Sequence, residues 1–263
     1  MYDFAYQKPS SVAEASQALA ADPDAKALAG GQTYIPVLKM RLAQPSALID
    51  LGKLGLSSIR VEGNSVVIGA MTTHRTVMTS PDVQAKIPAL AKLAGMIGDT
   101  QVRHRGTIGG SLANNDPAAC YPSAVLALGA TIKTNKRSIA ADDYFQGMFT
   151  TALEGDEIIT EVSFPIPEKA NYEKFRQPAS RYAMVGVFVA KFASGVRVAV
   201  TGASQGGVYR HAGMEKALSA SFTAEAAAGV STPAEGMNSD IHGSAEYRAH
   251  LVGVMTRRAV AGA

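Results

Sequence analysis

Two short glycine-containing segments carry the residue types best suited to bind a ligand. One is RHRGTIGGSLANND at 103–116, in which adjacent glycines lie between a threonine and a serine. The other is AGGQT at 29–33, which also places paired glycines beside a hydroxyl residue. Glycine allows positive φ and close approach of a ligand to the backbone, and successive amide N–H groups in such turns form anion-binding concavities. The chemistry that these segments predict is the binding of phosphate.

Each segment taken alone is also typical of an ordinary solvated turn or a flexible linker. A pair of them favours a diphosphate, because that group has two phosphates to be held. The sequence contains neither G-x-G-x-x-G after a strand nor G-x-x-x-x-G-K-[ST], the patterns of Rossmann and P-loop nucleotide sites. A dinucleotide would therefore bind without either fingerprint.

The other chemically capable residues form no recognisable catalytic or metal-binding set. The histidines lack ligand spacing and are interpreted as surface or capping residues; they are His74, His104, His211, His242 and His250. The single cysteine, Cys120, cannot form an internal disulfide or hold zinc or an iron–sulfur cluster by itself, so it is interpreted as a packed residue. The acidic pairs 142–143 and 156–157 are interpreted as turn and cap residues. The basic cluster 103–105 is either solvated or braces the neighbouring glycine loop.

The composition is that of a folded protein with a small-molecule partner. Of 263 residues, 47% are hydrophobic and 18% are charged, which is too apolar for a disordered chain. The net charge is +3, and no basic block with interleaved aromatic residues indicates nucleic-acid binding. No apolar run reaches the roughly 18 residues of a membrane span, and no signal peptide is evident. These features predict a cytoplasmic protein.

Hydrophobic periodicity and capping signals predict an α+β protein. We expect helices after the Ser11 cap at 12–20, at 34–42, as one long helix at 80–97, at 214–220 and at 245–260. We expect strands at 26–29, 47–51, 58–62, 65–68, 130–139, 157–164, 185–192 and 196–200. The segment 224–240 is interpreted as a surface loop, and a domain boundary is expected near Glu168.

Several segments together resemble a known flavoprotein family. They are AGGQTYIPVLKMRL, the IGA at 68–70, IGDTQVRHRGTIGGSLANNDP and SAEYRAHLVGVMTRRAV near the C-terminus. They resemble the FAD-binding medium subunit of molybdenum hydroxylases, above all the carbon monoxide dehydrogenase medium-subunit type, which is related to the FAD domain of xanthine dehydrogenase. The resemblance implies a vanillyl-alcohol-oxidase (PCMH)-type FAD-binding domain of two subdomains, at 1–56 and 57–168. A smaller C-terminal α+β domain at 169–263 follows.

The resemblance also implies which residues hold FAD. Those assigned to the pyrophosphate and nearby ribose are Lys26, Ala29, Gly30, Gly31, Gln32, Thr33, Thr107, Gly109, Gly110 and Ser111. Asn115 and Asp116 would bond the ribose or adenine-side groups, Ile159 would lie against the flavin or adenine, and Tyr182 would lie beside the isoalloxazine. Many family members have an acidic ribose ligand thirteen residues after Thr107, where this chain has Cys120. Either Asp116 compensates for it or that contact is lost.

The function implied by the resemblance is electron transfer within a heteromeric oxidoreductase. A large subunit with the molybdopterin cofactor would oxidise the substrate, and a small subunit with two [2Fe–2S] clusters would pass electrons to FAD in this chain and on to an external acceptor. The implied assembly is a dimer of heterotrimers. A free-standing FAD-dependent oxidase or reductase acting directly on an organic substrate is the alternative. A nucleotide-binding regulatory module without redox turnover is a third interpretation.

Overall fold

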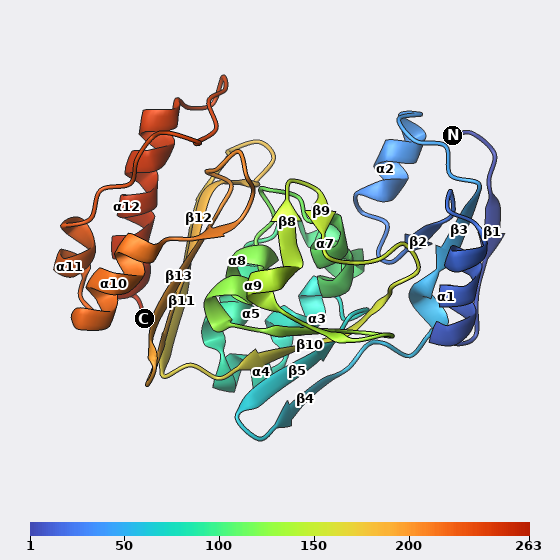
Figure 1. The fold of residues 1–263 in the computed structure, drawn as a ribbon, viewed down its shortest axis with the longest axis horizontal. Coiled ribbons are helices and arrows are strands. Elements are labelled where there is room, and N and C mark those ends of the chain that lie inside the picture. The colour runs from blue at the N-terminus through green and yellow to red at the C-terminus, as the bar shows by residue number, and fades with distance from the viewer.

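The computed structural model describes residues 1–263 as three units arranged in a row (Figure 1). The N-terminal unit is a small parallel sheet with strand order β1-β3-β2. Its elements are β1 (Ala5–Gln7), α1 (Val12–Ala21), β2 (Lys26–Leu28), α2 (Tyr34–Lys39), β3 (Ala47–Asp50) and the 3₁₀ helix η1 (Leu51–Lys53). The side chain of Ser11 accepts a hydrogen bond from the Glu14 N–H and starts α1, as the sequence predicts.

The central unit contains a five-stranded antiparallel sheet with strand order β4-β5-β10-β6-β7. Its strands are β4 (Ile59–Glu62), β5 (Ser65–Gly69), β6 (Thr131–Thr134), β7 (Ser138–Ala140) and β10 (Ile159–Pro165). Its helices are α3 (His74–Thr79), α4 (Pro81–Lys86), α5 (Pro88–Gly95), α6 (Thr100–Arg105), α7 (Ile108–Asn114), α8 (Tyr121–Leu128) and α9 (Ala141–Tyr144), and a small hairpin joins β8 (Phe145–Gly147) to β9 (Thr150–Thr151). The largest apolar cluster of the chain lies here.

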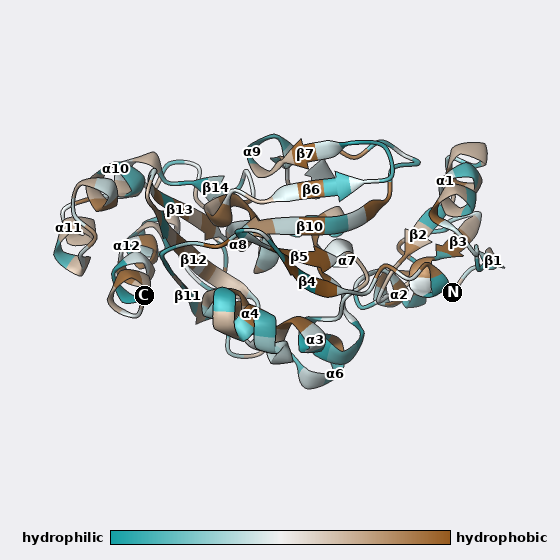
Figure 2. Cartoon of the chain, turned by 90° about the horizontal axis from the view of Figure 1, so that it is seen from below, coloured by the Kyte–Doolittle hydropathy of each residue, from teal (hydrophilic) through white to brown (hydrophobic).

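The C-terminal unit is a four-stranded antiparallel sheet covered by helices. Its elements are β11 (Lys169–Arg176), β12 (Ala183–Phe192), β13 (Gly195–Thr201), β14 (Tyr209–Arg210), α10 (Ala212–Ala220), α11 (Ala224–Ala228) and α12 (Ala245–Ala261). Figure 2 shows its brown, apolar strands between these helices and the central unit. Phe188 of β12 packs in the central cluster, whereas its neighbours Val187 and Val189 pack in the C-terminal cluster. Both faces of this sheet are therefore buried, because side chains alternate across a strand.

The structure corrects several expected elements. The helix expected at 80–97 is divided into α4 and α5 at Ile87, whose φ of −138° and ψ of 67° are not helical. Pro88 causes this break because its ring disfavours the helical conformation of the preceding residue. The strand expected at 130–139 is the hairpin of β6 and β7, the loop expected at 224–240 contains α11, and β11 was not predicted. The longest helix, α12, has 17 residues, and no helix is long and apolar enough to cross a membrane.

Candidate functional site

The two glycine loops lie in direct contact, although far apart in the sequence. A Cβ atom on Gly30 would overlap the main-chain carbonyl of Arg105 and would lie 2.8 Å from the Cα of Gly106. A Cβ atom on Gly110 would lie 3.3 Å from the Cβ of Ala29. Only residues without side chains allow this approach. The glycines thus bring β2 and its loop against the start of α7.

The first loop provides a run of backbone donors that the protein itself does not use. None of the N–H groups of residues 29–34 donates to an acceptor within the chain. The loop turns at Gly31, whose φ is +71°, and all six residues lie on the wall of the same cavity. A concavity of free amides is suited to an oxyanion such as phosphate.

The second loop is different, which corrects the expectation that both loops offer amides. The N–H of Ile108 donates to Thr72 and that of Gly109 to Ala70, at 3.1 and 2.8 Å. The N–H of Gly110 donates to the side chain of Thr107, which caps α7. The N–H groups of Ile108 and Gly109 therefore attach α7 to the segment that follows β5, and that of Gly110 is used in the cap of α7. What remains for a ligand is the N–H of Thr107 and the side chain of Ser111. Both residues line the cavity, and neither group makes a hydrogen bond within the chain.

A single cavity of about 760 Å³ runs along the contact of these loops. This volume lies in the range of roughly 300–1,000 Å³ that is usual for cofactor and ligand sites. All the predicted site residues except Asn115 line it: Lys26, Ala29, Gly30, Gly31, Gln32, Thr33, Thr107, Gly109, Gly110, Ser111, Asp116, Ile159 and Tyr182. The wall draws on the N-terminal unit, the central unit and the loop between β11 and β12, so the fold brings together residues that are dispersed in the sequence.

Asn115 does not reach the cavity. It is 3% exposed and has a φ of +42°, the left-handed conformation that ends α7. Its side-chain amide donates to the carbonyl oxygens of Gly147 and Thr150, both at 2.8 Å. Its role in the structure is to anchor the β8–β9 hairpin.

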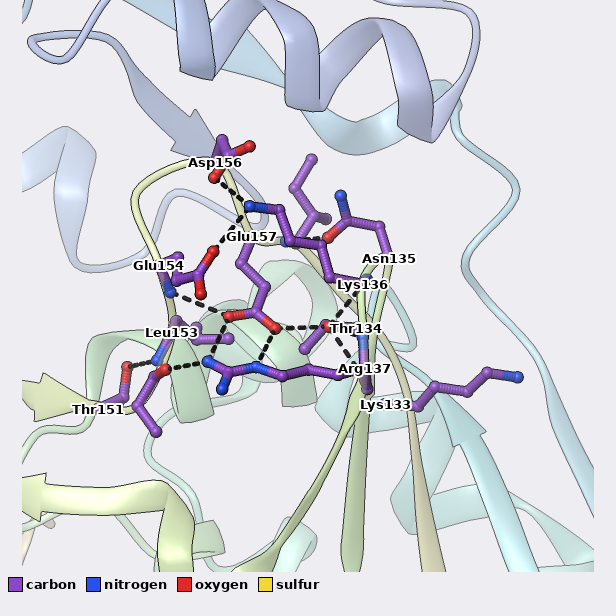
Figure 3. A network of polar contacts seen from close by, with 12 residues as sticks. Lys133, Thr134, Asn135, Lys136, Arg137, Thr151, Leu153, Glu154, Asp156 and Glu157 are labelled. Atoms are coloured by element: carbon purple, nitrogen blue, oxygen red, sulfur yellow. Dashed lines mark hydrogen bonds and ion pairs between the residues drawn. The ribbon is translucent and has the colours of Figure 1, made fainter.

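One end of the cavity is lined by Leu153, Glu157, Ile158 and Ile159, and a polar network holds this segment in place (Figure 3). The Glu157 carboxylate accepts from Arg137 Nε and Nη2 at 3.0 Å, from Thr134 Oγ1 at 2.7 Å and from the Glu154 N–H at 3.0 Å. These donors, Arg137 foremost, lower the pKa of Glu157 to about 2. The interpretation of 156–157 as turn and cap residues was therefore incomplete.

The same segment also joins the N-terminal unit to the central unit. The side chain of Ser16 in α1 donates to the Asp156 carbonyl at 2.8 Å and accepts from Asn135 at 3.0 Å. Asn135 accepts in turn from the Ile158 N–H at 2.8 Å. The apolar residues at this end of the cavity are thus fixed by contacts from two units.

The other end of the cavity is lined by Asp116, Cys120, Lys174 and Tyr182. Burial raises the pKa of Asp116, and burial together with the nearby Asp116 and Cys120 raises the pKa of Tyr182, so the phenol is neutral at pH 7. Tyr182 is 50% exposed at the cavity mouth. An aromatic ring, a carboxylate and an ammonium in one place can orient a polar heterocycle.

Two of the cavity residues that the sequence interpretation missed carry groups able to bind a ligand, His74 and Lys174. His74 was expected to be a surface or capping residue, but it is 6% exposed, and burial, aided by the charge of Arg103, lowers its pKa to about 4. His74 is therefore neutral at physiological pH. Lys174 lies in β11 two residues after the buried Tyr172 and on the same face. The alternation of buried residues along a strand could have placed Lys174 on the buried face, but it could not be used because β11 itself was not predicted.

No group of three or more His, Cys, Asp or Glu side chains is arranged to hold a metal ion. The residues that line the cavity instead suit an organic cofactor with a diphosphate. A family model matches residues 2–167, and it describes the FAD binding domain in molybdopterin dehydrogenase. The chain belongs to this family. As a member it is a FAD-binding oxidoreductase subunit, and the resemblance found in the sequence is confirmed.

Known relatives extend the match to almost the entire chain. A nicotine 6-hydroxylase medium subunit from Paenarthrobacter nicotinovorans is 40% identical, covering 97% of this chain and 95% of that protein. A carbon monoxide dehydrogenase medium chain from Hydrogenophaga pseudoflava is 37% identical, covering 98% and 96%. A chain of quinoline 2-oxidoreductase from Pseudomonas putida 86 superposes with a TM-score of 0.89 at 32% identity, covering 100% of this chain and 97% of that chain. These matches confirm the α+β FAD-binding fold and the family of molybdenum-hydroxylase medium subunits.

Proposed function

We propose that FAD lies extended in the 760 Å³ cavity with its diphosphate on the free amides of residues 29–34. The observation that carries this proposal is the run of unused backbone donors on the wall of the cavity, in a member of a FAD-binding family. In this orientation the adenine lies among the apolar side chains near Ile159, and the isoalloxazine lies at the mouth beside Tyr182. The Asp116 carboxylate can accept a hydrogen bond from a ribityl or ribose hydroxyl, because its single hydrogen bond within the chain, from the Ala118 N–H at 2.8 Å, leaves one oxygen free.

We further propose that the chain passes electrons rather than transforming a substrate itself. Electrons would reach FAD from [2Fe–2S] clusters of a small subunit, which receives them from the molybdopterin cofactor of a large subunit, and would leave to an external acceptor. FAD supplies the redox chemistry, while the protein supplies binding, orientation and electrostatics. The medium-subunit names of the relatives support such an assembly, and we propose a dimer of heterotrimers in the cytoplasm.

The test has two parts, which separate cofactor binding from assembly. The purified full-length chain should bind FAD stoichiometrically, as measured by its visible absorption spectrum and by titration calorimetry. Affinity purification of the tagged chain from its native host should co-isolate one molybdenum protein and one iron–sulfur protein. Recovery of the chain alone, with turnover of an organic substrate by its own FAD, would replace this proposal by a free-standing oxidase.

A further inference from the structure

The cavity wall contains a buried ammonium group that has no counter-ion in the chain. Lys174 is 8% exposed and lines the cavity. Its Nζ donates to the main-chain carbonyls of Met96 at 2.7 Å and Arg181 at 2.9 Å, and lies 3.5 Å from Cys120 Sγ. None of these partners is a carboxylate, and Lys174 takes part in none of the ion pairs of the chain.

This arrangement differs from that of the neighbouring lysine. Lys92 of α5 is more exposed and pairs with Glu173 at 2.6 Å. Lysine is rarely buried without a partner, because an uncompensated charge is costly to remove from water. The carboxylate that shares this end of the cavity, Asp116, accepts a hydrogen bond from the Ala118 N–H. It takes part in none of the ion pairs of the chain, so its oxygens lie more than 4 Å from Lys174 Nζ. The missing negative charge is therefore expected on the ligand.

The contacts of Lys174 also show which part of the cavity it serves. All three of its polar partners lie outside the phosphate loop 29–34, and one of them is the carbonyl of Arg181, the residue before Tyr182. Lys174 is thus fixed next to Arg181 and the half-exposed Tyr182, which line the mouth of the cavity. Under the proposed function this is the isoalloxazine end.

We infer that Lys174 is the charge-compensating residue of the flavin: its ammonium stabilises the negative charge that the isoalloxazine gains on reduction and so raises the reduction potential. Two electrons and one proton convert the oxidised ring to the anionic hydroquinone, whose charge is shared by N1 and the C2 oxygen. Positive charge near this locus is one of the means by which a protein tunes a flavin. The inference rests on the proposed orientation of FAD, with iron–sulfur clusters as the donors in the assembled enzyme.

The test compares the affinity of the full-length chain for oxidised and for reduced FAD. Dithionite, which is oxidised to sulfite, supplies the electrons, and the midpoint potential follows from spectra recorded with a reference dye. Lys174→Met removes the charge and all three donors. Lys174→Gln removes the charge but keeps N–H groups for the Met96 and Arg181 carbonyls, and it decides the question if the Met variant does not fold. Lys92→Met is the matched control, a lysine lost outside the cavity.

Both Lys174 variants should lower the preference for reduced over oxidised FAD at least tenfold, which corresponds to a midpoint potential about 30 mV lower for this two-electron couple. Lys92→Met should leave the potential unchanged. If Lys174→Gln has the same midpoint potential as the wild type, the role of Lys174 is only structural and the inference is overturned. If the Lys174 variants bind oxidised FAD, reduced FAD and ADP more weakly by the same factor, the ammonium of Lys174 compensates the diphosphate charge and not the flavin charge, and the inference is also overturned. Failure of wild-type chain to bind FAD would instead refute the proposed function.

Discussion

The replacement Glu157→Gln tests how the protein holds the apolar end of its cavity. The side chain of Glu157 is 0% exposed, and its pKa falls from 4.5 to about 2, chiefly through Arg137. One pKa unit corresponds to about 1.4 kcal/mol, so the shift represents roughly 3 kcal/mol. Because Arg137 is 46% exposed, solvent screens part of this interaction. We expect Glu157→Gln to lower the free energy of unfolding by about 2–3 kcal/mol at pH 7.

The pH dependence of this loss has a defined sign. The pKa of Glu157 is lower in the folded state, so its contribution is fully present above the ordinary value of 4.5 and is lost as the pH falls toward about 2. Urea denaturation of both proteins at several pH values between 7 and 2.5 measures the difference. The two stabilities should converge as the pH falls through this window.

A matched control is Glu154→Gln. Glu154 is 57% exposed and pairs with Lys136 at 2.8 Å, so its loss should change stability by only about 0.5 kcal/mol. A Glu157→Gln effect as small as this, or one that does not change with pH, would refute the argument that the buried carboxylate is held ionised by Arg137. Oxidised FAD should also bind more weakly to Glu157→Gln, because the replacement loosens the segment that contains Ile158 and Ile159, and both of these residues line the cavity.

Three further substitutions test the cofactor cavity. Gly30→Ala should abolish FAD binding, because its Cβ would overlap the Arg105 carbonyl, whereas Gly155→Ala, with no atom within 4 Å of the added Cβ, should bind normally; equal flavin content would contradict the loop contact. Gly110→Val should also lose FAD while the C-terminal unit stays folded, as circular dichroism and limited proteolysis would show, and full flavin content would count against it. Cys120→Asp should retain or strengthen binding of oxidised FAD, since it restores the acidic residue that many family members have at this position; clear loss measured by calorimetry would place the ribose contact elsewhere.

Local physical rules in the sequence were sufficient for much of the secondary structure. The Ser11 cap, the β4–β5 hairpin around Gly63 and the apolar strand β12 follow from capping, turn and alternation rules that act over a few residues. The same rules failed at Ile87, where the restriction imposed by Pro88 outweighed a continuous helical stripe. The paired glycine motifs led to the prediction of a diphosphate ligand, and together with the other matching segments they indicated the FAD-binding family, which the family model confirms.

Only the tertiary structure decided how the glycine motifs work. Sequence treated the two loops as equivalent amide cradles, but the amides of 108–110 are used within the chain and those of 29–34 are not. Asn115 lies within the predicted motif and yet anchors a hairpin, whereas Lys174, from a different unit, lines the cavity. The physical reason is that hydrogen-bond satisfaction and burial depend on partners distant in the chain, such as Ala70 for Gly109 and Met96 for Lys174. Spacing along a sequence identifies groups that can bind, and folding decides which of them remain free to do so.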